Sequence, residues 1–543
     1  MTSFLNRIKV ILSDRNASIA IIALAIVARV IQLIFFYNVR VDGMYQVMAM
    51  QNFVEGHGIS IGKVIPQDLS TVIYEPLTRW PPGYSLLLAP FYLLFNHNYI
   101  VAGIALDILA AIILIFACRK ILRTLESPLY LVNLFTLLTG FFIYYFYFIN
   151  SSDAVAICLF LLAISTTLSL LKKERSSPGT VVLISICLFL CGLIKYLFIP
   201  VVFVVPAFLF LKGMADKNRS IKMAGAFTFI LLFVLLGGVL GWQKINSDSV
   251  GYISESARGF YPENLVGAHP AIPASFVNTD TISLAFPADS PAMTIFFRFI
   301  QCLHLVLFLV AAFYVFKRII RYGFKKMAAT DSFFYLGFFL SAGITLVLVI
   351  LSLTVGKEEN IPGSWWTYVE EPRYYGLIHV LVQLGVFVLF QYYRANGSKR
   401  LKYLMIILTL LLLPETFRGI LFTARRVVNA KNEEYSWHVE KDIQMYGRNI
   451  IKREKQPDEN VVVTGSSYYI YYRMGMYNHM PALTNAGSIN NLSTLNTNKP
   501  TLLLVLLNEE DDDRYQQFRL AKETQFAGEM QGVYFYTVHV KPH

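Results

Sequence analysis

The stretch ASIAIIALAIVARVIQLIFFY, residues 17–37, decides the fold. As a helix that rises about 1.5 Å per residue, it is long enough to cross a hydrocarbon core about 30 Å thick. It follows Arg7, Lys9 and Arg15, as the core of a signal peptide would. However, it is longer than such a core and no Ala-x-Ala cleavage site follows it. We therefore interpret it as a retained first membrane span.

The rest of the chain has the same apolar character. Of its 543 residues, 55% are hydrophobic and 15% are charged, which indicates lipid rather than water as the solvent. The net charge is +12, but the basic residues form short clusters between apolar runs, and this argues against a nucleic-acid partner. The sequence predicts an α-helical polytopic membrane protein of about eleven spans, at 17–37, 98–118, 128–148, 153–171, 179–194, 196–211, 222–242, 293–316, 332–354, 375–393 and 403–422. The fifth and sixth are short and are predicted to be a broken pair around Lys195.

Clusters of basic residues predict the orientation of these spans. Lys and Arg are disfavoured on the translocated side of a membrane. The basic loops contain Arg119, Lys120 and Arg123; Lys172, Lys173 and Arg175; Lys212, Lys217 and Arg219; Lys317, Arg318 and Arg321; and Arg394, Lys399 and Arg400. An even number of predicted spans separates each of these loops from the basic N-terminus. We therefore expect the loops and the N-terminus on the same side, the cytoplasmic one. An odd number of spans then places the C-terminus outside.

The chain changes character after residue 428. We expect a transmembrane domain over 1–428, with long outer loops at 38–97 and 243–292, and a small soluble extracytoplasmic domain over 429–543. Strand-like runs at 461–464, 501–507 and 533–540, separated by helical or turn-like stretches, indicate an α/β domain. The segment Val461–Ser467 is similar to a strand entering a Gly-Ser turn at a phosphate site, but an ordinary strand-to-helix connection has the same pattern.

The first outer loop contains the residues best suited to chemistry. It opens with Val41-Asp-Gly-Met-Tyr45 and reaches Arg79-Trp-Pro-Pro-Gly-Tyr84 before the next apolar helix, predicted over 83–95. Residues 43–55 are predicted to form a helix in the membrane interface and to end at two glycines, Gly56 and Gly58. In this interfacial helix we expect Met44, Val47, Met48 and Val54 to face lipid, and Gln46, Gln51 and Asn52 to face water.

This order of motifs resembles the GT-C superfamily of membrane glycosyltransferases, especially the protein O-mannosyltransferase and lipid A aminoarabinose transferase group. The resemblance rests on the first span, Asp42 and Tyr45, the predicted helix and the Pro-Pro-Gly-Tyr84 motif. Three later motifs continue it in the same order: Asn150-Ser-Ser-Asp153, Leu193-Ile-Lys-Tyr196 and Glu371-Pro-Arg-Tyr-Tyr375. Each motif is short, so their order and topology carry the resemblance.

The resemblance implies an enzyme, a hexosyl- or pentosyltransferase. It would take a sugar from a polyprenyl-phosphate donor and pass it, with inversion, to a lipid, glycan or protein acceptor at the outer face of a bacterial inner membrane. Asp42 matches the acidic residue of the family's first outer loop and would act as the base toward the acceptor. An N-cap role for the following helix is the alternative. The family often has a second carboxylate beside the first, whereas this chain has Gly43, which puts a paired-acid role in doubt.

The departing lipid phosphate needs cationic stabilisation rather than a proton. Arg79, Lys195 and Arg373 are the candidate phosphate-binding residues, and the bidentate guanidinium of Arg373 suits a phosphate. The alternatives are a flanking Arg373 paired with Glu370 or Glu371, and a Lys195 that snorkels to the interface. The remaining candidates for the substrate pocket are Tyr45, Tyr84, Asp153, Tyr196, Glu371 and Tyr374.

No cofactor is indicated with certainty, and a divalent metal is left open. His57, His269, Asp68, Glu75 and Glu263 are expected on the outer side, but their spacing matches no known ligand pattern.

Two other functions compete with a glycosyltransferase. A flippase or transporter of lipid-linked saccharides should show repeats and helices broken at the bilayer midplane, and we find no internal repeat. A surface-polysaccharide polymerase or ligase should place several Arg and His residues in a late outer loop, but residues 243–292 contain only Arg258 and His269 of these types.

Overall fold

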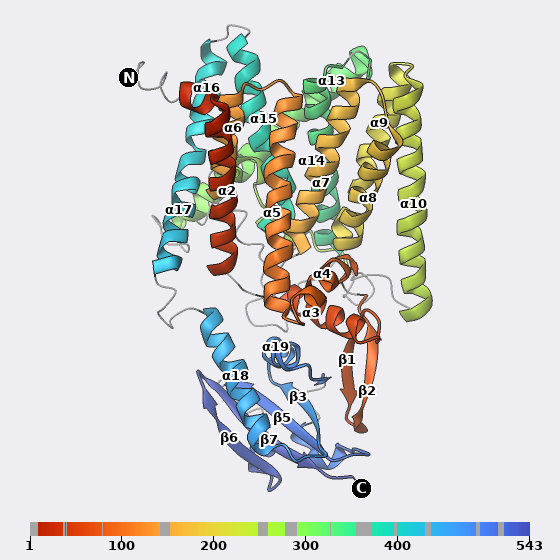
Figure 1. The fold of residues 1–543 in the computed structure, drawn as a ribbon, viewed down its shortest axis with the longest axis vertical. Helices are drawn as coiled ribbons and strands as arrows, with labels where there is room; N and C mark the ends of the chain where they lie inside the picture. The colour runs from red at the N-terminus through yellow and green to blue at the C-terminus, as the bar shows by residue number, and fades with distance from the viewer. Residues whose placement is uncertain are drawn as a thin grey trace. The chain divides into compact units, whose positions relative to one another are not determined.

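The structure is a computed structural model that describes residues 9–35, 39, 41–78, 80–141, 152–247, 259–276, 290–325, 327–354, 371–395, 399–428, 436–484, 489–508 and 515–542. The chain folds into two compact units (Figure 1). The first, here the helical unit, comprises residues 1–36, 104–245 and 249–427. The second, the mixed unit, comprises residues 37–103, 246–248 and 428–543.

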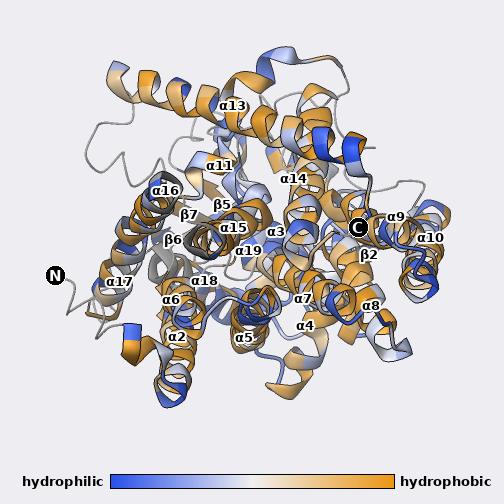
Figure 2. Cartoon of the chain, turned by 90° about the horizontal axis from the view of Figure 1, so that it is seen from above, coloured by the Kyte–Doolittle hydropathy of each residue, from blue (hydrophilic) through white to orange (hydrophobic). Residues whose placement is uncertain are grey.

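Apolar helices dominate the described part of the chain. Nine segments there are long and apolar enough to cross a membrane: α2 (Arg15–Phe35), α5 (Tyr99–Thr124), α7 (Ser152–Lys173), Tyr196–Ala215 ending in α9 (Val204–Ala215), α10 (Arg219–Ser247), α13 (Pro291–Tyr322), α14 (Ala329–Thr354), Pro372–Gln391 within η6 (Pro372–Tyr375) and α15 (Gly376–Ala395), and Ile406–Arg425 across α16 (Lys399–Leu410) and α17 (Leu412–Val428). Three shorter apolar helices in this part of the chain are α4 (Gly83–Leu94), α6 (Leu129–Phe141) and α8 (Pro178–Ile194). Every predicted span overlaps one of these segments, and Figure 2 shows apolar residues along the helices. The chain is a multi-pass membrane protein.

Close backbone contact joins α2 to α6 inside the helical unit. A Cβ atom added to Gly140 would lie 2.9 Å from Cα of Ala25, so only glycine fits there. Small residues that let helix backbones approach are the usual means of packing helices in lipid, where the hydrophobic effect between helices is absent. Nearby, Arg29 donates to the carbonyl oxygen of Thr139, which anchors a buried guanidinium to the same helix pair.

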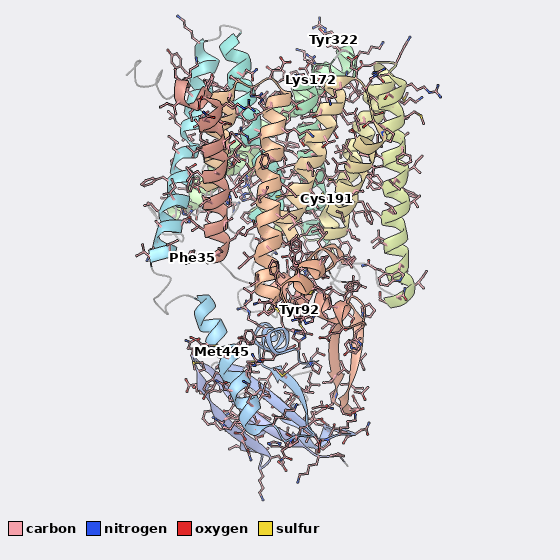
Figure 3. The ribbon with its side chains drawn as sticks, in the orientation of Figure 1. Phe35, Tyr92, Lys172, Cys191, Tyr322 and Met445 are labelled. Atoms are coloured by element: carbon pink, nitrogen blue, oxygen red, sulfur yellow. The ribbon has the colours of Figure 1, made fainter. Side chains whose placement is uncertain are left out.

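The basic helix ends lie at one end of the helical unit. Lys172 at the end of α7 and Tyr322 at the end of α13, next to Arg318 and Arg321, occupy the same end, while Cys191 lies within the bundle (Figure 3). This arrangement is the one expected if all the basic loops lie on one side of the membrane.

The mixed unit is built on a seven-stranded sheet of order β2-β1-β4-β3-β5-β7-β6. Its strands are β1 (Ser60–Ile65), β2 (Asp68–Pro76), β3 (Asn460–Gly465), β4 (Ala482–Leu483), β5 (Thr501–Asn508), β6 (Thr524–Met530) and β7 (Val533–Val540). Its helices are α3 (Val41–Val54), α4 (Gly83–Leu94), α18 (Ser436–Glu454), α19 (Tyr468–Asn478) and α20 (Gln516–Leu520). The three predicted strands are β3, β5 and β7. They form the centre of the sheet, where Val462, Leu503 and Val505 are fully buried.

The first outer loop contributes two strands to this sheet. β1 pairs with β2 in antiparallel fashion, and it pairs in parallel with β4 through Lys63–Ala482 and Val64–Leu483. Val64 and Leu69 enter the same hydrophobic cluster as Val462 and Leu503. The predicted division at residue 428 places this loop with the membrane domain, whereas strand pairing places it in one compact unit with the C-terminal segment.

The predicted exposure of the two faces of α3 is wrong. Met44 and Val47 are buried within the mixed unit, but so are Gln46 at 0% exposed and Gln51 at 3% exposed. The helix packs against α4, β1 and α19, so protein surrounds the faces that we expected in lipid and in water. It ends at Val54, one residue before the predicted end, and the nearby Gly56 has a φ of 89°, which glycine adopts without strain.

Packing against the neighbouring strand explains the glycine in the Gly-Ser turn after β3. A Cβ at this position would lie 2.3 Å from the carbonyl oxygen of Leu506 on the neighbouring strand, so only glycine fits. The next residue, Ser466, accepts a hydrogen bond from the backbone N–H of Asn508 at 3.1 Å. These contacts are those of an ordinary strand-to-helix connection.

Candidate active site

A break in the apolar helices presents Lys195. Helix α8 ends at Ile194, and Lys195 takes an extended conformation with φ −143° and ψ 117°. A 3-10 turn, η2 (Tyr196–Phe198), follows before the chain resumes a helical course toward α9. The predicted broken pair around Lys195 is therefore confirmed. The break therefore places a charged residue at the junction of two apolar segments, where an ionisable group is a candidate for a functional site.

Asp153 forms ion pairs with two of the three candidate phosphate-binding cations. It lies in the first turn of α7, and its Oδ1 atom lies 2.9 Å from Nζ of Lys195. Its Oδ2 atom lies 3.8 Å from Nη1 of Arg373, which comes from the 3-10 turn η6. The side chains of Asp153, Lys195 and Arg373 are 3%, 11% and 9% exposed, so one carboxylate and two cations meet away from bulk water.

Glu371 and Tyr374 complete this cluster. Oε1 of Glu371 lies 3.5 Å from Nε of Arg373. The ring centroid of Tyr374 lies 4.8 Å from Nζ of Lys195 and 5.1 Å from Cζ of Arg373, so one aromatic ring contacts both cations. The predicted alternative of an ion pair between Arg373 and Glu371 is thus present together with the Asp153 contact. We call Asp153, Lys195, Glu371, Arg373 and Tyr374 the charged cluster.

Two carboxylates approach Arg373 at more than hydrogen-bond distance. Charge-assisted N–H···O bonds are about 2.7–2.9 Å long. The 3.8 Å and 3.5 Å separations from Asp153 and Glu371 exceed that length, whereas Lys195 and Asp153 meet at 2.9 Å. The cluster therefore combines one short ion pair with a guanidinium that two carboxylates approach at longer range.

Tyr196, also among the predicted pocket residues, binds the end of α10. Its hydroxyl lies within hydrogen-bond distance of Gln243, at 2.7 Å from Nε2 and 3.1 Å from Oε1. Gln243 is 2% exposed and was not predicted. Its only signal in the sequence is its place where the seventh predicted span meets the long second loop.

The mixed unit contains the other predicted residues that the structure describes. Asp42 is half-buried in the first turn of α3, so it is a helical residue rather than the cap that precedes the helix. Tyr45 stacks on Trp80 with ring centroids 4.3 Å apart and contacts Tyr472 at 4.9 Å. Tyr84, at the start of α4, is fully buried. Arg79 lies outside the described residues.

The residues named for a divalent metal have other partners. His57 stacks on Tyr74, with centroids 3.8 Å apart, and Glu75 forms an ion pair with Lys63. Asp68 accepts hydrogen bonds from Ser70 and Thr71. Across the described residues, no group of three or more His, Cys, Asp or Glu side chains is arranged to hold a metal ion.

A histidine pair near the charged cluster was not predicted. Nε2 of His269 lies 3.3 Å from Nε2 of His379, and Nδ1 of His379 lies 3.0 Å from Oγ of Ser275. Burial, and then the neighbouring His379, lowers the pKa of His269 well below its usual value, so this imidazole is neutral at physiological pH. The ring of His269 also lies 5.2 Å from that of Tyr375, the residue after Tyr374 of the charged cluster.

Known structures share this fold. The chain is similar to ArnT from Cupriavidus metallidurans, with a TM-score of 0.51 at 10% identity over 96% of this chain and 97% of ArnT. ArnT bound to undecaprenyl phosphate gives a TM-score of 0.48 at the same identity and coverage. The apo oligosaccharyltransferase of Archaeoglobus fulgidus gives 0.46 at 13% identity, over 93% of this chain and 71% of that one.

The TM-score of ArnT, at 10% identity, establishes a likeness of fold alone. This likeness confirms the predicted GT-C-like fold. No protein-family model matches the chain, and no curated protein matches it in sequence.

Proposed function

We propose that the chain is a membrane-embedded glycosyltransferase that moves a hexosyl or pentosyl group from a polyprenyl-phosphate donor to an acceptor at the outer face of a bacterial inner membrane. The charged cluster is the observation that carries the proposal. It holds two cations, Lys195 and Arg373, at a break in the apolar helices, where a lipid phosphate would leave. The fold shared with ArnT, a lipid A aminoarabinose transferase, supports a transferase over a transporter.

The charges of the cluster suit an anion that comes and goes. Lys195 and Arg373 carry two positive charges, and Asp153 and Glu371 carry two negative ones, so the cluster is neutral without a ligand. When a phosphate enters, its oxygens can replace the long carboxylate contacts of Arg373, while the short pair between Lys195 and Asp153 keeps the ammonium in place. Developing charge on the departing phosphate then meets cations that are already oriented, which lowers the barrier.

Asp42 is the proposed base toward the acceptor hydroxyl or amine. Its place in the first turn of α3 puts its carboxylate at the positive end of a helix dipole, which stabilises the ionised form that a base requires. Proton transfer of this kind contributes about 10²–10⁴-fold to a rate.

The test of this function is transfer from a panel of polyprenyl-phosphate sugars to membrane extracts by the purified protein. Wild type should transfer one of the sugars, and Asp42→Asn should reduce transfer at least 100-fold while melting normally. Asp331→Asn is the matched control, because Asp331 is also a first-turn carboxylate, at the start of α14. Absence of transfer by wild type from every donor would refute the glycosyltransferase assignment. Full transfer by Asp42→Asn would refute the assignment of Asp42 as the base.

The proposed orientation has a separate test. With the N-terminus in the cytoplasm and the mixed unit outside, alkaline phosphatase fused to the C-terminus should be active in a bacterial host. Green fluorescent protein fused to the C-terminus should not fluoresce, because it would be exported through the Sec pathway. The opposite pair of results would place the mixed unit in the cytoplasm and remove the outer-face assignment.

A further inference from the structure

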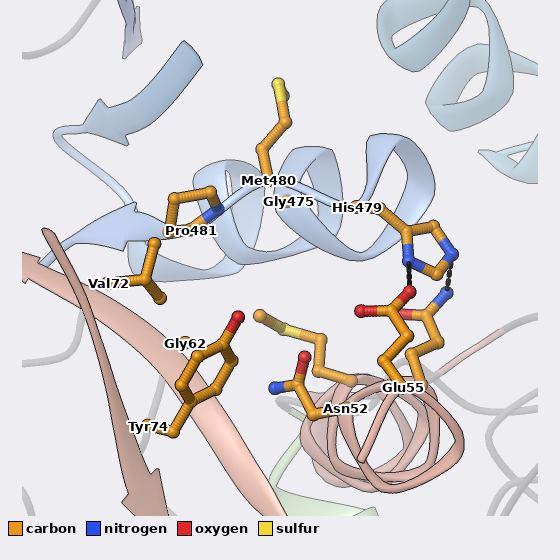
Figure 4. A pocket seen from close by; sticks show the side chains of 11 residues that line it. Asn52, Glu55, Gly62, Val72, Tyr74, Gly475, His479, Met480 and Pro481 are labelled. Carbon is orange, nitrogen blue, oxygen red and sulfur yellow. Dashed lines mark hydrogen bonds and ion pairs between the residues drawn. The ribbon is translucent and has the colours of Figure 1, made fainter. Parts of the chain in front are cut away.

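A pocket in the mixed unit is lined by none of the residues proposed for transfer. It is formed between α3, the β1–β2 hairpin and the end of α19, and it contains about 420 Å³ of empty space, part of it open to solvent. Figure 4 shows Tyr74 and Asn52 directed toward its middle, with Glu55 joined to His479 on one side. We propose that this pocket binds a sugar ring of the acceptor, an inference that rests on the proposed function.

The polar groups of the pocket match a polyhydroxylated ligand. The side chains of Gln51, Asn52, Glu55, Tyr74 and His479 line it, and together they offer amide, carboxylate, phenol and imidazole groups. Such groups can donate to and accept from hydroxyls at several positions of one ring. A small number of polar groups on an otherwise apolar wall is the usual composition of a ligand site.

The charge of the pocket excludes anionic ligands. None of the eleven lining residues is Lys or Arg, and Glu55 contributes a carboxylate. A phosphate or carboxylate ligand would be repelled there, because no cation compensates its charge. Burial, and then the charge of Glu55, raise the pKa of Tyr74, which keeps its hydroxyl protonated as a donor. A neutral sugar or an amino sugar is the class that remains.

The apolar wall suits the C–H face of such a ring. Met48, Val72, Met480 and Pro481 supply apolar surface opposite the polar groups. Gly475 also lines the pocket, where a longer side chain would take up space. A ligand ring with one apolar face and hydroxyls at its rim can contact both kinds of wall, whereas an aliphatic chain could form no hydrogen bond with the amides and the carboxylate.

His479 fixes the shape of the pocket. It takes a left-handed backbone conformation at the end of α19, with φ 53° and ψ 52°, which is uncommon outside glycine. Its Nδ1 lies 3.2 Å from Oε1 of Glu55, and its Nε2 lies 2.8 Å from Nε2 of Gln51 and 3.1 Å from the hydroxyl of Tyr92. The amide nitrogen of Gln51 is a donor, so Nε2 of His479 accepts and Nδ1 donates to Glu55. These bonds hold the carboxylate in place before a ligand arrives.

The test measures binding first, with the full-length protein in detergent micelles. Saturation-transfer NMR with the methyl glycosides of glucose, galactose, mannose and N-acetylglucosamine should show saturation of the ring protons of at least one sugar. Tyr74→Leu should strongly weaken this saturation signal. Ile73→Ala is the control, because Ile73 neighbours Tyr74 on strand β2 and is similarly exposed, at 45% against 36%, but does not line the pocket. Glu55→Gln serves if Tyr74→Leu does not fold.

Kinetics then separate this inference from the proposed function. In the transfer assay, Tyr74→Leu should raise the acceptor KM about tenfold, the loss expected for a hydrogen bond and its neighbouring contact, with the donor KM unchanged. An unchanged acceptor KM in an active enzyme would overturn the pocket assignment alone. Sugar binding by a wild type that transfers nothing would overturn the transferase alone. Failure of all four glycosides to bind wild type would overturn the inference.

Discussion

Nζ of Lys195 lies 2.9 Å from Oδ1 of Asp153, at the point where α8 breaks and the chain turns toward α9. The pair joins two spans that start or stop at this level of the helical unit. Both residues are nearly buried, at 11% and 3% exposed, so each charge depends on the other for compensation. The contact therefore links the local break in the helix to the position of a cation that the proposed chemistry requires.

Removing the carboxylate of this pair should destabilise the protein. Asp153→Asn leaves Lys195 and Arg373 without their shared partner, and breaking a buried pair typically costs about 3–5 kcal/mol. Asp331→Asn breaks the pair with Arg318, whose side chains are 35% and 43% exposed, and should cost at most about 1 kcal/mol. Thermal unfolding in detergent compares the two variants. Equal melting temperatures would show that the Asp153 pair is not buried as described.

Packing of α2 against α6 gives a second stability test. Gly140→Leu would force a side chain into Cα of Ala25, and overpacking of this kind costs about 1–3 kcal/mol. Gly237→Leu on α10 is the control, since a Cβ at Gly237 meets nothing within 4 Å. The first variant should melt at a lower temperature and the second near wild type. A normal melting temperature for Gly140→Leu would contradict the close approach of the two helices.

The sheet should lose stability in acid through Asp68. Hydrogen bonds from Ser70 and Thr71 hold the pKa of this carboxyl well below its usual range, and Asp68 also accepts a hydrogen bond from Asn498. A lowered folded-state pKa means that the stabilisation is complete above about pH 4 and is lost as the pH falls below it. Wild type should therefore lose more melting temperature between pH 7 and pH 3 than Asp68→Asn does. Parallel pH profiles for the two proteins would contradict this.

Much of the helical unit could be predicted because lipid imposes a simple rule. A span must be apolar for about 20 residues, and this length is visible in the sequence without any knowledge of tertiary contacts. The break at Lys195 was visible for the same reason, since a charged residue interrupts two short apolar runs. The same rule failed for α3, because a row of Met and Val residues can face lipid or protein equally well, and Gln46 is buried by α4, β1 and α19.

Long-range strand pairing limited how much of the mixed unit could be predicted from the sequence. β1 and β4 are joined through Lys63–Ala482, and nothing local in either segment records a partner more than 400 residues away. The charged cluster shows the same limit. Asp153, Lys195 and Arg373 were each recognised by motif, but that one carboxylate approaches both cations follows only from the packing of α7 beside the helix break.

The most direct test of the account is the affinity of the full-length protein for undecaprenyl phosphate, measured by microscale thermophoresis in detergent. Arg373→Ala should bind at least tenfold more weakly than wild type, because a bond to a charged group contributes about 1.5–3 kcal/mol. Arg373→Lys should recover only part of this loss, since an ammonium cannot bind two phosphate oxygens as a guanidinium does. Arg318→Ala, at a solvent-exposed ion pair, should bind as wild type does. An Arg373→Ala protein that is folded and binds the lipid phosphate with wild-type affinity would contradict the assignment of the charged cluster as the phosphate site.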